Sequence, residues 1–243
     1  MKPKIIKLGS MYFDGNPVAP GFHFNKEILD FGDTVKSKAL EWVEDRGLLY
    51  ATSCACYGIS WDQLNDHGYI FGRPVNIDGK QYQCRCIKLR SSDFGKVGEW
   101  AYLLDRYSNH DKIWHWKKTL FWGQEKNGRS VVLAGGRTSL SISYHYPWVN
   151  DFRIGFRPVL VPMKNPLKLT EAIVGKQIAV CNHMTGKKIL GTVSEFDDYD
   201  LVLAVSSSLP SGFAAGVVER DGLVIINRKW PGLYLEEAPD DEV

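Results

Sequence analysis

Hydrophobic residues occur in short runs along this chain, and Gly, Pro and Asn separate the runs. This pattern predicts many short strands joined by turns. One hairpin is well marked, because Asp78-Gly79 lies between two such runs and this pair favours a two-residue turn. The predicted strands cover residues 48–58, 73–90 (as the hairpin), 130–136 and 153–162.

Three segments have the sequence features of short helices, and they cover residues 34–47, 60–68 and 98–108. The first begins after the capping residue Thr34 and ends at Gly47. The second is capped by Ser60 and ended by Gly68. In the third, large hydrophobic residues recur at the spacing of one helix face. Short strands mixed with a few helices predict an α+β fold.

The composition changes after Pro166, where alternating strand runs with glycine turns replace the mixed pattern. We therefore expect a first domain over residues 1–165 and a small β-rich appendage, built as a five-stranded barrel, over residues 166–243. The appendage is expected to serve self-association or anchoring to a larger assembly. The sequence does not choose between these two roles.

Composition narrows the class of protein. The 243 residues carry a net charge of +2, which argues against nucleic acid as a partner. No run approaches the ~18 apolar residues of a membrane span, and the N-terminus lacks the apolar core of a secretory signal. The odd count of five Cys favours reduced thiols. These features predict a protein that is cytoplasmic as synthesised and that has no membrane span.

The segment between the Gly-Gly of residues 135–136 and the strand predicted at 153–162 is rich in Tyr, Ser, His, Trp and Asn. Tyr and Trp offer rigid contact area, while Ser and Asn offer adaptable hydrogen bonds, as in antibody binding sites. The alternative is that its aromatic rings pack into the core. The candidate ligand-binding residues are Arg137, Ser139, Ser141, Ser143, Tyr144, His145, Tyr146, Trp148, Asn150 and Asp151.

Two Cys-x-Cys pairs form a second cluster of chemically competent residues: Cys54, Cys56, Cys84 and Cys86. On neighbouring strands, residues at i and i+2 share a face, so four sulfurs in reach of one zinc ion are one interpretation. The favoured interpretation is that these are small buried side chains, since Cys is among the most buried residue types. No other His, Asp or Glu pattern predicts a metal or a cofactor.

The order of four motifs, EWAYLLDRY, WHWKKTLFWGQE, VVLAGGR and GFRPVL, resembles the formylglycine-generating-enzyme variant of the C-type lectin fold. The resemblance covers about residues 50–162 and implies a C-type-lectin-like first domain. One branch of this group contains oxidases with reactive cysteines near the last strands. The chain has no Cys between Cys86 and Cys181, which argues against an enzyme. The other branch contains the variable proteins of diversity-generating retroelements, whose framed segment is diversified to bind ligands.

The resemblance implies a phage or prophage recognition protein, with the virion as an expected location and a protein or a glycan as ligand. A formylglycine-generating-type oxidase or another enzyme, and a structural subunit of a phage or surface assembly, are the alternatives. Gly155, Phe156 and Arg157 are expected to be framework, with Phe156 buried and Arg157 paired with an acid. The framework is also expected to include Trp114, Trp116 and Trp122 as core residues.

Overall fold

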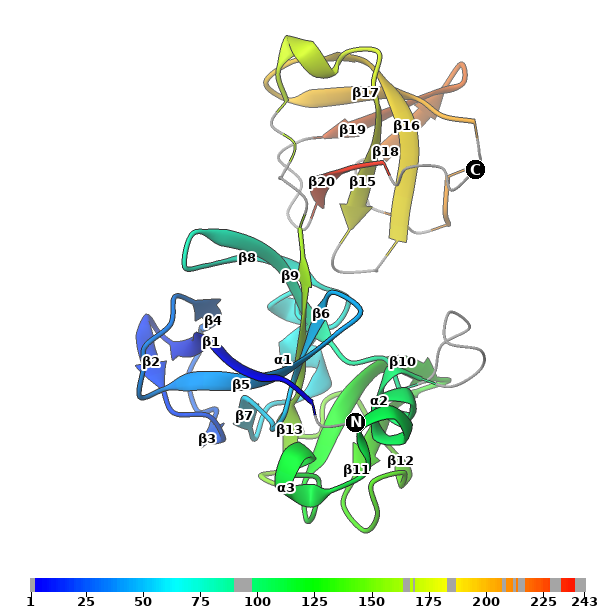
Figure 1. Ribbon diagram of the computed structural model, residues 1–243. Coiled ribbons are helices and arrows are strands. Elements are labelled where there is room, and N and C mark those ends of the chain that lie inside the picture. Colours follow the sequence, from blue (N-terminus) through cyan, green and yellow to red (C-terminus); the bar gives the residue numbers. More distant parts are fainter. Residues whose placement is uncertain are drawn as a thin grey trace. The chain divides into compact units, whose positions relative to one another are not determined.

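The computed structural model describes residues 3–89, 98–163, 167, 169–182, 187–206, 209–211, 213, 217–227 and 233–238. The chain divides into two compact units, Met1–Pro162 and Met163–Val243. Figure 1 shows the strands and helices of each unit along the colour gradient from blue to red. Each unit has a hydrophobic core of its own.

The first unit is built on two sheets. Strands of the larger sheet follow the order β2-β1-β5-β6-β14-β9-β8, and β4 also pairs with β1. Its members are β1 (Ile5–Phe13), β2 (Asn16–Val18), β4 (Leu29–Gly32), β5 (Ala39–Asp45), β6 (Leu48–Ala51), β8 (Arg73–Ile77), β9 (Lys80–Cys86) and β14 (Pro158–Pro162). The predicted hairpin is confirmed as β8 and β9. Asp78 and Gly79 form its turn with φ of 51° and 76°, the positive values that this turn requires.

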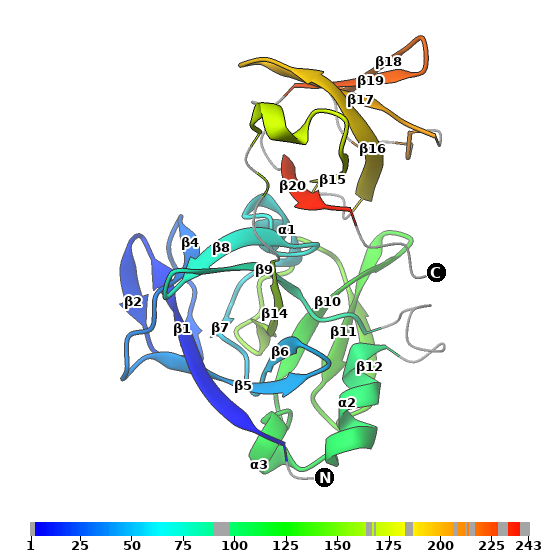
Figure 2. The ribbon, with the colours of Figure 1, turned by 45° about the horizontal axis from the view of Figure 1, so that its top comes forward.

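The second sheet has the order β12-β11-β10-β13-β7-β3, which places β12 at an edge beside β11 (Figure 2). Its members are β3 (Phe22–His23), β7 (Cys56–Tyr57), β10 (Leu120–Asn127), β11 (Ser130–Gly135), β12 (Ile142–His145) and β13 (Ile154–Phe156). The predicted strand at 153–162 is therefore two strands in two different sheets. The predicted strand at 48–58 divides in the same way, into β6 and β7.

The side chains between these two sheets form the main core. Trp42, Trp61 and Trp122 are almost fully buried in it. Each indole N–H donates to a backbone carbonyl, of Leu8, Gly123 and Ile59 respectively, which satisfies the one polar group of each ring. A second cluster forms around Trp100, Trp114 and Phe121, and the expected burial of Trp114 and Trp122 is confirmed. Trp116 is only partly buried against this cluster.

Two of the three predicted helices are confirmed. In α1 (Trp61–Asp66), the Ser60 hydroxyl accepts from the Gln63 N–H and the Gln63 side chain accepts from the Ser60 N–H, which is a complete capping box. The other is α2 (Glu99–Tyr107), and a short α3 (Asp111–Trp114) follows it. The helix predicted at 34–47 is wrong. Its centre is β5, which pairs with β1 on one side and β6 on the other.

Strands dominate the described residues, so the expectation of an α+β, C-type-lectin-like fold is wrong and the protein is β-rich. The physical reason is visible in β5, where Leu40 and Trp42 face one core and Val43 faces the other. A segment with a core on each face and a partner on each edge is stabilised as a strand whatever its local propensity.

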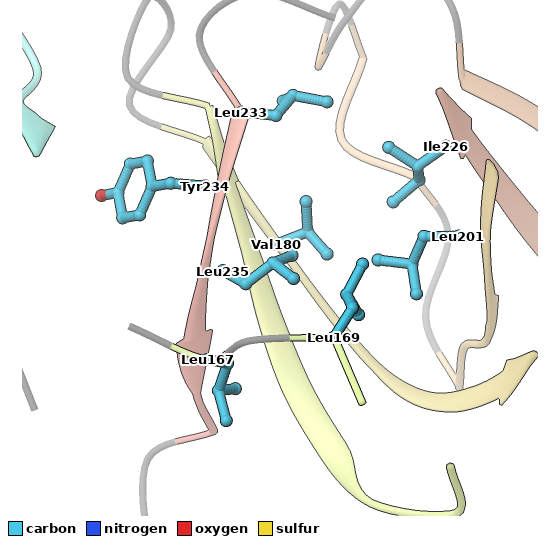
Figure 3. A pocket seen from close by; sticks show the side chains of 8 residues that line it. All are labelled: Leu167, Leu169, Val180, Leu201, Ile226, Leu233, Tyr234 and Leu235. Carbon is cyan, nitrogen blue, oxygen red and sulfur yellow. The ribbon is translucent and has the colours of Figure 1, made fainter. Parts of the chain in front are cut away.

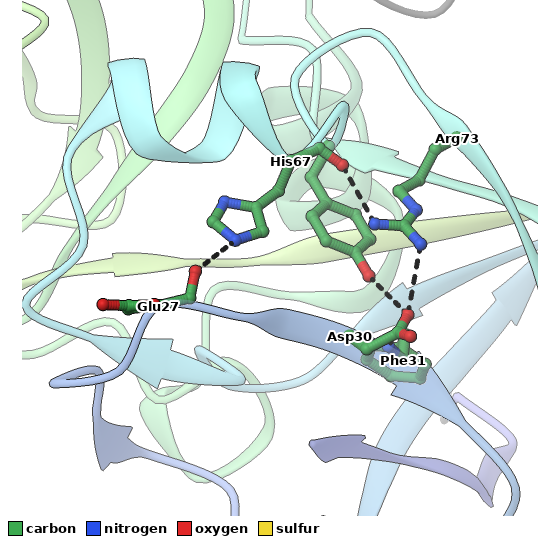
Figure 4. A network of polar contacts seen from close by, with 6 residues as sticks. Glu27, Asp30, Phe31, His67 and Arg73 are labelled. Atoms are coloured by element: carbon green, nitrogen blue, oxygen red, sulfur yellow. Dashed lines mark hydrogen bonds and ion pairs between the residues drawn. The ribbon is translucent and has the colours of Figure 1, made fainter. Parts of the chain in front are cut away.

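A polar network fastens α1 to the first sheet (Figure 4). One Asp30 carboxylate oxygen accepts from the Arg73 guanidinium at 3.3 Å and from the Tyr69 hydroxyl at 3.4 Å. Arg73 also donates to the carbonyl of His67, the residue that caps the end of α1. The His67 ring lies 3.0 Å from the Glu27 carbonyl. These contacts hold α1 in place, and α1 in turn contacts the candidate site.

In the second unit a 3-10 turn, η1 (Glu171–Ile173), precedes a sheet of order β18-β19-β17-β16-β15-β20, which has six strands instead of the expected five. Its strands are β15 (Gln177–Asn182), β16 (Lys187–Phe196), β17 (Asp200–Ala204), β18 (Val217–Arg220), β19 (Leu223–Asn227) and β20 (Leu233–Glu237). Aliphatic side chains, with Phe213, form its core.

Candidate functional site

The segment from Arg137 to Arg153 begins at a backbone turn that only glycine fits well. Gly135 and Gly136 have φ of 95° and 90°. A Cβ on Gly135 would lie 2.4 Å from the Thr119 carbonyl oxygen. The pair therefore ends β11 and directs the chain back along its outer edge as β12.

Three framework hydrogen bonds hold this segment at its start, middle and end. The Trp100 indole N–H donates to the Ser139 carbonyl at 2.6 Å. The Asp62 N–H, in the first turn of α1, donates to the Pro147 carbonyl at 3.0 Å. The Leu120 N–H donates to the Arg153 carbonyl at 3.0 Å. A segment fixed at three points loses little further conformational freedom when it binds a ligand.

Large apolar side chains of this segment lie in solvent. Tyr146 and Trp148 are 51% and 63% exposed, and their rings stack on each other with centroids 4.6 Å apart and planes at 5°. Phe152 is 68% exposed, with the Arg153 guanidinium above its ring. We call the exposed side chains of Tyr144, Tyr146, Trp148 and Phe152 the aromatic face. Their exposure rules out the alternative that these four rings pack into the core.

Several predicted ligand-binding residues lie elsewhere than on the aromatic face. Ser139 is buried, so its side chain is not presented to solvent. The Ser141 hydroxyl is hydrogen-bonded to Thr138 in the turn before β12. Asn150 is exposed, and its side-chain oxygen lies near Gly58.

Asp151 is bonded to Arg153 through both carboxylate oxygens, at 2.7 and 3.1 Å. The Arg153 side chain and backbone N–H lower the pKa of Asp151 from 3.8 to about 2. The carboxylate is therefore ionised across the physiological pH range, and it neutralises one of the cations of the segment.

A hollow of about 660 Å³ lies next to β12. Its lining consists of Lys118, Leu120, Gly135, Gly136, Arg137, Ser141, Ile142, Ser143, His145 and Arg153. Four of the predicted residues, Arg137, Ser141, Ser143 and His145, are thus brought together here. We call this hollow the cationic pocket, since three of its lining side chains are Lys or Arg and, among the described lining residues, none is Asp or Glu.

Lys118 is a site residue that sequence reasoning missed. It precedes β10 and reaches the cationic pocket because β10 and β11 are paired. Its φ of 61° lies in the left-handed region, which a lysine rarely adopts and which is enriched at functional sites. The only signal in the sequence is the Lys117-Lys118 pair after a Trp-rich run, and that signal is too weak to identify a site by itself.

The four N-terminal cysteines do not assemble as the zinc interpretation requires. Cys56, on β7, and Cys84 and Cys86, on β9, are buried side chains of the main core. Cys54 packs in the other cluster, around Trp100. Burial raises the pKa of all four thiols, which are free and protonated. Among the residues that the structure describes, no group of three His, Cys, Asp or Glu side chains is placed to hold a metal ion.

The framework expectation holds for Phe156, which is fully buried, but not for the partner of Arg157. Instead of an acid, the buried Arg157 guanidinium donates to the carbonyls of Ala51, Thr52 and Trp114. It also lies over the rings of Trp100 and Phe121, at 5.0 and 4.5 Å from their centroids. Burial lowers the pKa of Arg157, and the carbonyls and rings compensate the charge in place of a carboxylate.

Two other hollows differ from the cationic pocket in chemistry. One, of about 240 Å³ in the second unit, is lined mainly by aliphatic side chains (Figure 3). In Figure 3, Tyr234 points to the opposite side of β20 from Leu233 and Leu235, so its hydroxyl lies away from the aliphatic group. The other, of about 390 Å³, includes Cys54 and His115 in its lining, but the Cys54 thiol is buried and protonated.

None of the helices described in the structure is long and apolar enough to cross a membrane. Comparisons of the chain with protein-family models, with curated proteins and with solved structures give no match. The function therefore rests on the site itself.

Proposed function

We propose that this protein is a recognition protein that binds a protein or glycan ligand through the aromatic face of residues 144–152. The observation that carries the proposal is the stacked Tyr146–Trp148 pair, exposed on a segment that the framework holds at three points. Exposed large rings raise the free energy of the unbound protein in water, and a ligand that covers them recovers that energy.

The chemistry of the face also supports recognition. Tyr and Trp are the residues whose truncation most often costs about 2 kcal/mol or more of binding free energy in interfaces. Asn150, which is exposed, lies between Trp148 and Phe152 in the sequence and offers hydrogen bonds. We include in the proposal that this face is diversified, as the residue types suggest, in a protein of phage or prophage origin.

The double variant Tyr146→Ser with Trp148→Ser tests the proposal. Wild type and variant are applied to arrays of glycans and of cell-surface proteins, and we expect the variant to lose the ligands that wild type binds. Because both side chains are more than half exposed, the melting temperature should change little. The control is Tyr199→Ser, which removes another exposed aromatic side chain, in the second unit.

Retention of every ligand by the double variant would overturn the proposal. Loss of folded structure in the double variant would also overturn it, because it would show that these rings stabilise the fold.

The proposed diversification is tested by sequencing closely related copies of the gene. We expect variation at residues 144, 146, 148, 150 and 152, which are exposed, and little at Ser139, which is buried. Equal variation throughout residues 137–153 and their neighbours would contradict it.

A further inference from the structure

The cationic pocket has the size of a ligand site. Its volume of about 660 Å³ falls within the ~300–1,000 Å³ of small-molecule pockets. Its walls come from three separate parts of the first unit: the approach to β10, the Gly135-Gly136 turn, and β12 with Arg153. The pairing of β10 with β11, and of β11 with β12, holds these walls together.

The cationic pocket has an excess of positive charge. Arg153 is neutralised by Asp151, which lies 2.7 Å away. Within the described part of the chain, neither Lys118 nor Arg137 forms an ion pair. A hollow lined by one sign of charge focuses its field, because the protein walls have a lower dielectric constant than water. The pocket therefore attracts anions.

The cationic pocket and the aromatic face both include residues of β12, but no side chain of the aromatic face is in the described lining of the pocket. Ile142, Ser143 and His145 line the pocket, while Tyr144 is exposed and belongs to the aromatic face. The Ser143 hydroxyl oxygen is buried without a hydrogen-bond partner in the described structure, a state that is rare in folded proteins. A ligand in the pocket would supply a partner once this hydroxyl turned toward it.

We propose that the cationic pocket is a second binding site, for a small hydroxyl-rich molecule that carries a carboxylate or a phosphate. The oxyanion lies between Lys118 and Arg137, and the hydroxyl groups bond to Ser141, Ser143 and His145. The lining residues that the structure describes include no Phe, Tyr or Trp on which a nucleobase stacks, so a sugar-like body fits better than a nucleotide. This proposal does not depend on the aromatic face, and the two proposals are tested separately.

Calorimetric titration of the full chain with three compounds tests the proposal: glucuronate, glucose 6-phosphate and glucose. We expect at least one of the two anions to bind and glucose not to bind, and the tighter anion identifies the group that the pocket prefers. Arg137→Gln and Lys118→Gln should each weaken that binding on the order of tenfold, since each removes a charge-assisted contact.

The matched control is Arg129→Gln, which makes the same charge change in the turn at the other end of β11. It should bind the anion as wild type does. The variant Tyr146→Ser with Trp148→Ser should also bind it normally, which separates this site from the aromatic face. The proposal is overturned if neither anion binds, if glucose binds equally well, or if Arg129→Gln weakens binding as much as the two pocket variants. Unchanged binding in both pocket variants overturns it too.

Discussion

At the scale of single residues, the two arginines that bracket β13 show how surroundings decide the role of one side-chain type. Arg153 is exposed and forms an ion pair with Asp151 two residues earlier. Arg157 is fully buried, and carbonyls and aromatic rings surround its guanidinium. The first arginine adjusts the charge of the binding segment. The second ties β14 to the ends of β6 and α3, and so belongs to the framework.

The Asp151–Arg153 pair predicts a measurable titration. The folded-state pKa of Asp151 is about 2, below its ordinary value of 3.8, because Arg153 donates to the ionised carboxylate. A lowered pKa means that this contact stabilises the fold above about pH 4 and is lost as the pH falls toward 2. Carboxyl NMR should find this low pKa in wild type and a pKa nearer 3.8 in Arg153→Gln. An ordinary value in wild type would show that the ion pair does not persist in solution.

At the scale of elements, the edge strand β12 contributes to both proposed sites, since Tyr144 belongs to the aromatic face while Ile142, Ser143 and His145 line the cationic pocket. Its position depends on the turn at Gly135-Gly136, where both residues have positive φ. The Gly135 N–H also donates to the Ser141 carbonyl, which continues the pairing of β11 with β12 into the turn. The turn therefore sets which side chains of β12 face the cationic pocket.

Substitution of Gly135 should reveal this dependence. Gly135→Ala places a Cβ 2.4 Å from the Thr119 carbonyl oxygen, so we expect a loss of unfolding free energy of more than about 2 kcal/mol. Gly128→Ala is the control, because Gly128 also has a positive φ but nothing lies within 4 Å of its added Cβ. It should cost only about 1 kcal/mol, the cost of a left-handed alanine. Chemical denaturation compares the two, and equal losses would contradict the proposed close contact.

At the scale of the whole molecule, the chain has two units with separate cores, and both proposed sites lie in the first. The second unit has its own buried core, mainly of aliphatic side chains, and the described lining of the cationic pocket belongs to the first unit. The expectation that the second unit mediates self-association, and the alternative of a structural subunit, stay predictions. Size-exclusion chromatography with light scattering tests both.

The separation of cores predicts that damage to the second unit stays local. Leu203 is fully buried there, and Leu203→Ala should lower the unfolding free energy of that unit by about 2–5 kcal/mol. Hydrogen exchange should accelerate in β15 to β19 while the strands of the first unit keep their protection. Leu190→Ala, at an exposed position on β16, is the control and should change little. Equal acceleration in both units would show that they unfold as one.

The sequence by itself determined the features that depend on neighbours along the chain. Ser60 and Gln63 cap α1 through each other, and Asp78-Gly79 adopts the hairpin turn, because all of these contacts are made within a few residues. The residue types alone identify residues 137–153 as a candidate binding segment. The structure then shows that Tyr146 and Trp148 of this segment are exposed.

Only the tertiary structure decided the rest, because those features depend on partners far along the chain. Residues 39–45 form a strand rather than a helix since β1 and β6 pair with both of its edges. Arg157 finds its carbonyl partner at Ala51, 106 residues away. Lys118 becomes a pocket residue only when β10 and β11 pair. Burial and hydrogen bonding between distant segments outweigh local propensity, and no local pattern records which segments will meet.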